Sequence, residues 1–286
     1  MSSIFIKKYS ATITTSLLTS LLSTSKNTIT ARVDLSLLLK RTMSSTSPSH
    51  TFPTNKLNLL IEPDKKPLVL LTCGSFNPVT YMHLRMMEIA RDKMNQTGKY
   101  QVIGAYLSPV GDAYKKATLI PAKHRIEMLE LGLQDSDWMM MDIWESNNPE
   151  FTPTRIVMDH IKDQVGKYLL QNNIDRDVSY KFVCGADLLG SFNIPNLWAE
   201  KDMDLITSNE HYGVVCLERE GTDLEAIFSK NHILTKNKQD INIVPIEILN
   251  NISSTKIREK VKAKESVKYL IPDKTIDYIK EHKLYQ

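Results

Sequence analysis

Residues 70–83 read Leu-Leu-Thr-Cys-Gly-Ser-Phe-Asn-Pro-Val-Thr-Tyr-Met-His and join a predicted strand to a predicted helix through a glycine turn. The apolar run at 68–73 has the length of a buried parallel strand, and Gly74 permits a close backbone approach that a side chain would block. From Tyr81 onward, apolar residues recur at helical spacing. The segment is therefore predicted to be the first half of a βαβ unit.

The glycine turn is a candidate phosphate-binding site. A helix that begins near Tyr81 directs backbone N–H groups and the positive end of its dipole toward the turn. Thr80 and His83 are predicted to add side-chain donors one helical turn apart. A lone glycine turn or a lone histidine is more often structural, but their combination between a strand and a helix favours a polyphosphate ligand.

A second candidate anion site lies near the other end of the sequence, where residues 250–258 read Asn-Asn-Ile-Ser-Ser-Thr-Lys-Ile-Arg. The hydroxyl residues at 253–255 are good N-caps for a helix predicted over 257–262, and Lys256 and Arg258 add positive charge. A plain capped helix with a basic face is the alternative. Two such sites in one α/β domain favour phosphate binding.

These two motifs carry a resemblance to a known family. The order Gly-Ser-Phe-x-Pro-x-Thr-x-x-His at 74–83 resembles the phosphate-binding motif of the eukaryotic nicotinamide/nicotinic acid mononucleotide adenylyltransferases, within the nucleotidyltransferase superfamily. The run at 252–258 matches their Ile-Ser-Ser-Thr-x-(Ile/Leu)-Arg signature. Further matches follow in family order: Ser-Pro-Val-Gly-Asp-Ala-Tyr-Lys-Lys at 108–116, Trp-Glu-Ser at 144–146, Cys-Gly-Ala-Asp-Leu-Leu at 184–189 and Pro-Asn-Leu-Trp at 195–198. The resemblance covers roughly residues 66–285.

Strands and helices are predicted to alternate along the chain. Compact apolar runs predict strands at 68–73, 102–107, 138–143, 180–183, 212–217 and 241–248. Helical periodicity follows from Tyr81 and at 121–133, 154–170, 223–228 and 257–262. This order predicts an α/β fold with a Rossmann-like, doubly wound, mainly parallel sheet in a single catalytic domain. Because ligands bind beyond the carboxyl ends of such strands, the motifs should converge on one cleft.

Residues 1–50 differ in composition from the rest. They hold six Lys or Arg, one acid and twenty-one Ser or Thr, which makes their net charge +5. This predicts a disordered leader that acts as a mitochondrial transit peptide, followed by a linker at 51–66 and the catalytic domain at 67–286. A disordered tail without a targeting signal is the first alternative. Initiation at Met43 is the second, and either alternative would leave the protein in the cytoplasm or nucleus.

Charge and composition also limit which classes of partner the protein can have. Since the whole chain carries +3 and the leader +5, the remainder carries −2, which argues against a nucleic-acid partner. No apolar run reaches the length of a membrane span. The three cysteines fall in or beside predicted strands and are interpreted as reduced core residues, and the scattered histidines argue against a protein-built zinc site.

The resemblance implies an activity and its partners. Members of the family transfer the adenylyl group of ATP to nicotinamide mononucleotide or nicotinate mononucleotide, forming NAD or deamido-NAD and pyrophosphate. The 5′-phosphate of the mononucleotide attacks the α-phosphorus directly, so no covalent enzyme intermediate is implied. The implied cofactor is Mg²⁺ held by the ATP phosphates, with no metal ligand from a protein side chain. A homo-oligomer is the implied assembly.

The resemblance also implies site residues. His83, Ser254 and Arg258 take the catalytic positions. The implied ATP site consists of Gly74, Phe76, His83, Ser253, Ser254, Thr255, Lys256, Ile257 and Arg258. The implied mononucleotide and NAD site consists of Gly74, Ser75, Phe76, Lys116, Phe151, Thr154, Gly185, Asp187, Leu197, Trp198 and Asn250. Trp144 is either a wall of the site or a core aromatic.

One position departs from the family pattern. Phe151 stands where relatives commonly place Trp or Tyr against the nicotinamide, although the spacing to Thr154 is kept. Phenylalanine is a weaker partner for a cationic ring than tryptophan, so affinity for the mononucleotide and discrimination between amide and acid are in question. The alternative functions are another adenylyltransferase or cytidylyltransferase of the superfamily, and a nucleotide-binding scaffold without turnover.

Overall fold

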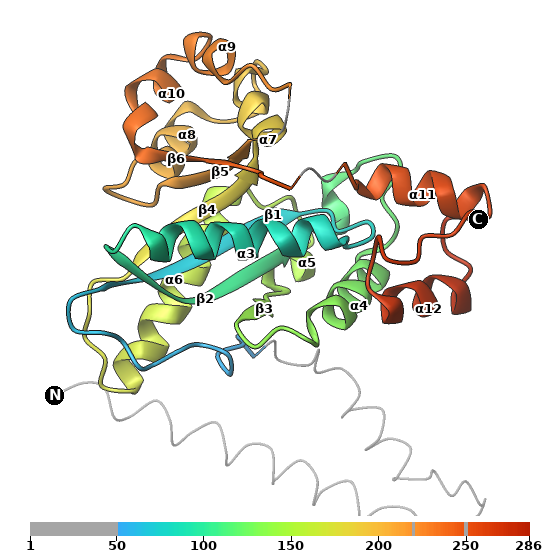
Figure 1. Cartoon of the computed structure of the whole chain (residues 1–286), viewed down its shortest axis with the longest axis horizontal. Helices are drawn as coiled ribbons and strands as arrows, with labels where there is room; N and C mark the ends of the chain where they lie inside the picture. The colour runs from blue at the N-terminus through green and yellow to red at the C-terminus, as the bar shows by residue number, and fades with distance from the viewer. Residues whose placement is uncertain (1–50, 219–220, 249–250) are drawn as a thin grey trace, which may run out of the picture. The chain divides into compact units, whose positions relative to one another are not determined.

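The computed structural model describes residues 51–218, 221–248 and 251–286 (Figure 1). Within these ranges six strands form one parallel sheet in the order β3-β2-β1-β4-β5-β6. The strands are β1 Lys66–Gly74, β2 Tyr100–Pro109, β3 Met139–Met141, β4 Ser179–Gly185, β5 Val214–Glu218 and β6 Ile241–Pro245. Strand order reverses between β1 and β4, where doubly wound sheets bind ligands. The predicted Rossmann-like fold is confirmed.

Helices cover both faces of the sheet (Figure 1). On one face, α3 (Tyr81–Gln96) and α4 (Ala122–Leu133) pack through apolar residues onto Leu68 and Leu70 of β1. On the other face, α6 (Thr154–Gln171) and α8 (Glu200–Thr207) pack in the cluster that contains Val69 and Leu71. Because alternate residues of a strand point to opposite faces, β1 is buried on both sides, as its continuous apolar run predicts.

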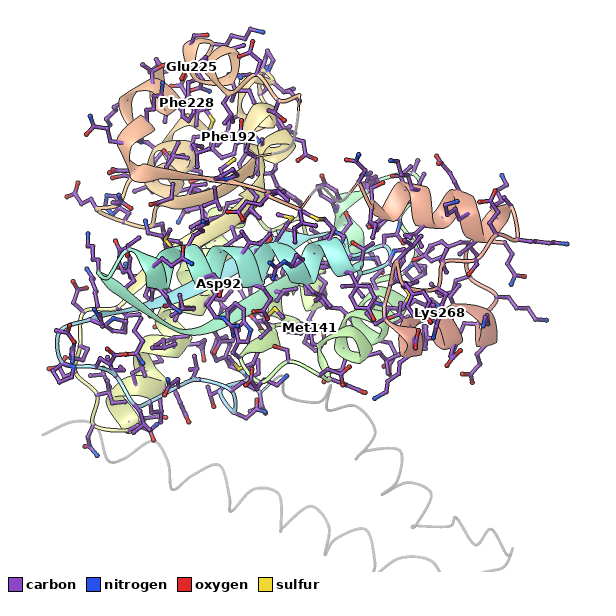
Figure 2. The ribbon with its side chains drawn as sticks, in the orientation of Figure 1. Asp92, Met141, Phe192, Glu225, Phe228 and Lys268 are labelled. Atoms are coloured by element: carbon purple, nitrogen blue, oxygen red, sulfur yellow. The ribbon has the colours of Figure 1, made fainter. Side chains whose placement is uncertain are left out.

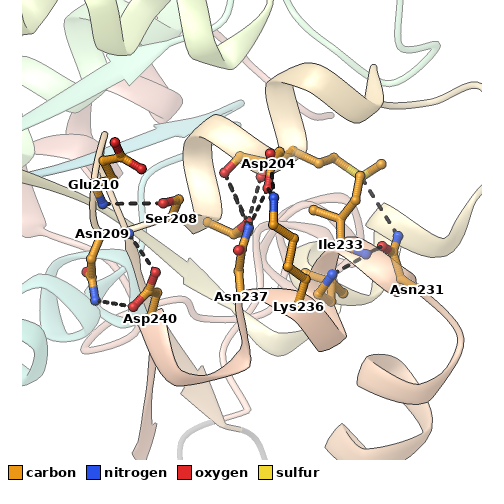
Figure 3. Close-up of polar contacts among 12 residues, drawn as sticks. Asp204, Ser208, Asn209, Glu210, Asn231, Ile233, Lys236, Asn237 and Asp240 are labelled. Atoms are coloured by element: carbon orange, nitrogen blue, oxygen red, sulfur yellow. Dashed lines mark hydrogen bonds and ion pairs between the residues drawn. The ribbon is translucent and has the colours of Figure 1, made fainter.

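Short helices surround the β5–β6 edge of the sheet. Here α7 (Ala186–Gly190), α9 (Leu224–Ser229) and α10 (His232–Lys236) lie near α8, and Phe192 and Phe228 lie among these helices (Figure 2). Asp204 of α8 accepts hydrogen bonds from Lys236 Nζ at 2.9 Å and Asn237 Nδ2 at 2.8 Å (Figure 3). These two bonds hold the pKa of Asp204 below its usual value and tie α8 to α10.

The C-terminal helices α11 (Ser254–Lys262) and α12 (Asp273–Glu281) share a separate apolar cluster with α4. Ile257 of α11, Ile276 of α12 and Met128 of α4 are buried in it. This packing holds the first turn of α11 close to the turn that follows β1, because α4 packs on the same face of the sheet as α3.

The segment predicted to be a linker at 51–66 is instead part of the domain. Phe52 stacks on Tyr106 of β2 with ring centroids 4.8 Å apart, and Leu57 is buried in the core. The backbone N–H of Asn58 donates to the carbonyl of Ile103 at 2.8 Å. The linker prediction was wrong because these apolar side chains find a surface on β2 that the local pattern does not reveal.

Other boundaries differ in smaller ways. The strand predicted at 138–143 is limited to β3, because Asp142 turns its carboxylate back to accept the N–H of Trp144 at 3.2 Å, at the start of α5 (Trp144–Asn147). The predicted transit peptide at 1–50 and the site residue Asn250 lie outside the described residues. In the described ranges no helix combines the length and apolar character needed to cross a membrane.

Candidate active site

The turn after β1 is shaped by Gly74 and Phe76. Phe76 has a left-handed backbone with φ 43°, which folds its buried ring back toward β1. A Cβ placed on Gly74 would lie 3.1 Å from Phe76 Cζ, so glycine leaves the space this ring occupies. The ring meets His83 edge-on with centroids 5.4 Å apart. The turn therefore fixes one wall for the His83 imidazole.

His83 is oriented by the N-cap of its own helix. Its Nδ1 accepts the backbone N–H of Thr80 at 3.0 Å, and the Thr80 hydroxyl oxygen lies 2.8 Å from the same nitrogen. An imidazole that accepts at Nδ1 carries its proton on Nε2 in the neutral form, so Nε2 is a donor. Thr80 is fully buried, so it orients His83 rather than serving as the second ligand donor that the sequence suggested.

The second motif meets the first across 176 residues of sequence. Ser253 caps α11 by accepting the N–H of Lys256 at 3.3 Å. Ser254 Oγ donates to the carbonyl of Pro78 at 2.8 Å. Arg258 donates through Nη1 to the carbonyl of Asn77 at 2.9 Å. These bonds hold the first turn of α11 against the glycine turn.

A cavity of about 220 Å³ lies between the two motifs. Its walls carry the donors His83, Lys116 and Arg258, together with hydroxyls from α11. The lining residues are Ser75, Phe76, Asn77, His83, Lys116, Thr118, Leu119, Ser254, Thr255 and Arg258. No acidic side chain is among them, so the cavity suits a polyanion such as a chain of phosphates.

Four residues of the predicted ATP site do not line this cavity: Gly74, Ser253, Lys256 and Ile257. Ser253 acts as the N-cap, and Lys256 is exposed. Ile257 is fully buried in the C-terminal apolar cluster, and its N–H donates to Ser253 O at 3.0 Å within the helix. Its side chain thus packs α11 against α4 and α12.

The predicted mononucleotide residues are spread beyond the carboxyl ends of the strands. Phe151 is 57% exposed and stacks with Tyr114 at 6.0 Å. Trp198 lines a different cavity, of about 690 Å³, and donates from Nε1 to Ser191 Oγ at 3.0 Å. Five further residues lie outside both cavities: Gly74, Thr154, Gly185, Asp187 and Leu197. Only Ser75, Phe76 and Lys116 of this set join the phosphate cavity.

Trp144 is half-buried and does not line the phosphate cavity. Its ring stacks on His160 at 4.2 Å with an interplanar angle of 9°, and it packs against the apolar cluster around α6. His160 Nε2 lies 3.4 Å from Oδ2 of the buried Asp142. The tryptophan therefore covers one face of the His160 ring, next to the buried Asp142.

Arg125 is a site residue that the sequence reasoning missed. This fully buried guanidinium donates to the carbonyls of Ile120 at 2.9 Å, Ser75 at 3.1 Å and Val110 at 2.7 Å. It also lies 3.3 Å from the Asp112 carboxylate. It therefore ties the glycine turn to the loop that carries Lys116. The available signal was its position on the buried stripe of α4, three residues after Ala122.

Glu145 supports the same loop from α5. Its buried carboxylate accepts the hydroxyl of Ser108 at 2.5 Å, and Ser146 Oγ donates to the carbonyl of Pro109 at 2.7 Å. Burial raises the pKa of Glu145 to about 7, against a smaller lowering by the Ser108 hydrogen bond and Arg125. The carboxyl group is therefore protonated in the folded protein at pH values where the unfolded chain carries a charge.

We expect Glu145→Gln to flatten the pH dependence of stability. With a folded pKa of about 7 against 4.5, Glu145 favours folding below pH 4.5 and loses this contribution as the pH rises to 7. The loss amounts to about 3 kcal/mol at most. Urea unfolding at pH 4.5 to 8 measures the effect, with the exposed Glu150→Gln as the matched control. Equal slopes for wild type and Glu145→Gln would contradict this assignment.

Fold, strand order and cavity together define a class. A family model described as Cytidylyltransferase-like matches residues 71–260, which is more than half of the chain and includes both cavity motifs. The protein is therefore a nucleotidyltransferase.

The relatives narrow the class to one family. The nicotinamide/nicotinic acid mononucleotide adenylyltransferase of Arabidopsis thaliana is 42% identical, over 78% of this chain and 91% of its own length. The corresponding protein 1 of Bos taurus is 39% identical, over 78% and 90%. Protein 1 of Saccharomyces cerevisiae is 39% identical over 84% of this chain, which spans 61% of that relative. The chain belongs to the nicotinamide/nicotinic acid mononucleotide adenylyltransferase family.

A solved structure agrees on the fold. It is nicotinic acid mononucleotide adenylyltransferase of Plasmodium falciparum complexed with APC, and it superimposes with a TM-score of 0.54 at 20% identity. The match covers 76% of this chain and 96% of that one. The same architecture therefore persists where most side chains differ.

Proposed function

We propose that this protein transfers the adenylyl group of ATP to nicotinamide mononucleotide and to nicotinate mononucleotide, forming NAD or deamido-NAD and pyrophosphate. The observation that carries the proposal is the cavity of about 220 Å³, where His83, Lys116 and Arg258 gather beside the first turn of α11. The names of the Arabidopsis and Bos relatives support the choice of acceptor.

The reaction needs alignment and charge stabilisation more than proton transfer. An oxygen of the mononucleotide 5′-phosphate forms a bond to the α-phosphorus of ATP. The bond from that phosphorus to the α–β bridging oxygen breaks, and its electron pair leaves with pyrophosphate. Because the attacking phosphate is already an anion at neutral pH, no general base is required. The protein's contribution is to hold both phosphates in line and to stabilise the charge on the oxygens.

The cavity residues divide this work. His83 donates from Nε2 because Thr80 occupies Nδ1. Arg258, anchored on Asn77, brings a guanidinium to the same wall, and backbone N–H groups at the start of α11 face the phosphates. Lys116 stands on the opposite loop, where it is suited to the mononucleotide phosphate. Two anions can thus be held on either side of the reacting phosphorus.

Mg²⁺ enters the proposal as a ligand of ATP. Over the described ranges no group of three or more His, Cys, Asp or Glu side chains is placed to hold a metal ion. Mg²⁺ bound to the ATP phosphates would supply positive charge that favours the departure of pyrophosphate.

The remaining mononucleotide contacts are proposed at the ends of β4 and α6. A Cβ on Gly185 would lie 2.6 Å from Asp187 Oδ1, so glycine leaves room for this exposed carboxylate beside the end of β4. A carboxylate in that place suits ribose hydroxyls. Leu197, Trp198, Phe151 and Thr154 are proposed to surround the pyridine ring. Phe151 offers a flat apolar face there, with less attraction for a cation than tryptophan.

The direct test is product formation by the full chain. Purified protein is mixed with ATP, MgCl₂ and either mononucleotide, and the formation of dinucleotide and of pyrophosphate is followed over time. We expect NAD or deamido-NAD and pyrophosphate to form in equal amounts. Parallel reactions replace ATP with CTP, or the mononucleotide with other phosphorylated acceptors. Turnover only with another pair would overturn the acceptor assignment, and ATP binding without any product would favour a scaffold.

A further inference from the structure

Tyr285 lies beside the glycine turn although it is 208 residues away in sequence. After α12 the N–H of Leu284 bonds back to the carbonyl of Ile279 at 3.0 Å, and Tyr285 has a left-handed φ of 63°. Its hydroxyl donates to Asn77 Oδ1 at 2.8 Å. Burial raises the pKa of Tyr285 well above its usual value, so the hydroxyl keeps its proton at neutral pH.

Asn77 connects three segments around the phosphate cavity. It is 3% exposed, and its Nδ2 donates to the carbonyl of Thr118 at 2.8 Å. Its backbone carbonyl accepts Arg258 Nη1 at 2.9 Å. Because a carbonyl can only accept, the Asn77 amide nitrogen must face Thr118, and the amide oxygen must then face Tyr285. The Thr118 carbonyl thus selects the orientation of the amide, and the Tyr285 hydroxyl supplies the donor for its oxygen.

We propose that Tyr285 is a positioning residue for adenylyl transfer, acting through Asn77. This inference rests on the proposed function. Tyr285 does not line the cavity, whereas Asn77, Thr118 and Arg258 do. Without the hydroxyl, Asn77 Oδ1 is a buried acceptor without a donor, and the bond that fixes the Thr118 loop weakens. The loop carries Lys116, so its movement separates the groups that align the two substrates.

The variant Tyr285→Phe tests this with the ring retained. We expect kcat/KM for ATP to fall about 5- to 20-fold at 25 °C, which corresponds to the loss of one buried hydrogen bond. The assay is run where circular dichroism shows both proteins fully folded, since a purely structural role would then leave kcat and KM unchanged. Tyr269→Phe is the matched control, because Tyr269 belongs to the same C-terminal region and is 80% exposed.

A double-mutant cycle with Asn77→Ala identifies the route. If Tyr285 acts through Asn77, adding Tyr285→Phe to Asn77→Ala causes no further loss. Multiplied losses in the double variant, or a Tyr285→Phe enzyme equal to wild type, would overturn the inference.

Affinity for a non-hydrolysable ATP analogue, measured by calorimetry, separates this inference from the proposed function. A wild type that binds the analogue but forms no NAD refutes the acceptor assignment alone. The weaker analogue binding expected for Tyr285→Phe still reports on the positioning role, and equal binding would count against it.

Discussion

Replacing His83 by alanine is expected to lower kcat for adenylyl transfer by about 100-fold or more, the usual cost of a preorganised donor at a developing charge. The expectation rests on geometry, because Thr80 holds Nδ1 and leaves Nε2 as the donor at the cavity wall. Loss of the acceptor for the Thr80 N–H should cost about 1 kcal/mol in the free energy of unfolding and leave the variant folded. Steady-state kinetics with both mononucleotides measure the effect.

The matched control is His211→Ala, because His211 is exposed and does not line the cavity. It should retain full activity. His83→Gln is a second variant, since its amide N–H can replace the Nε2 donor in part, and it should recover some of the lost rate. A His83→Ala enzyme within about threefold of wild type would contradict the assigned donor role, because such a donor contributes far more.

Arg125→Met should have the largest effect on stability. The substitution keeps an apolar side chain of similar reach but leaves the buried carbonyls of Ser75, Val110 and Ile120 without their donor. We expect a loss of about 3–5 kcal/mol in the free energy of unfolding, since removing one partner leaves buried groups uncompensated. Chemical denaturation measured by tryptophan fluorescence gives this quantity.

Two further variants make the Arg125 test specific. Arg85→Met removes an exposed arginine from α3 and should cost little. Arg125→Lys keeps the charge but not the planar fork, so it should recover only part of the stability. At temperatures where Arg125→Lys is folded, we expect its kcat to be lower than that of wild type, because the glycine turn and the Lys116 loop are no longer held by one group. Full activity would show that Arg125 only stabilises the fold.

The sequence predicted the sheet well where strands are buried on both faces. The strand predicted at 68–73 is observed as β1, which is longer by two residues at its start and one at its end. The helix predicted at 154–170 agrees closely with α6, because its apolar residues repeat at one helical face over its full length. Short elements were predicted less well, since brief runs carry too little periodicity. The strand predicted at 138–143 is longer than the observed β3, and α12 was not predicted.

The sequence identified those residues of the candidate site whose role follows from residue type and local turn geometry. Gly74, His83 and the hydroxyl residues at 253–255 follow from turn, capping and phosphate chemistry together with the family resemblance. Of these, His83, Ser254 and Thr255 meet at one cavity, which agrees with the rule for the carboxyl ends of parallel strands. The roles assigned to individual site residues remain predictions for the kinetic tests above.

By itself the sequence determined the α/β alternation, both phosphate motifs and the family, because each depends on neighbouring residues within one strand, turn or helix. Tertiary structure alone decided the roles of Arg125, Asn77 and Tyr285. Their partners are carbonyl and amide groups of loops up to 208 residues away, and every residue except proline offers the same backbone groups. Only the packing of α4, α11 and α12 selects which of these groups each side chain meets.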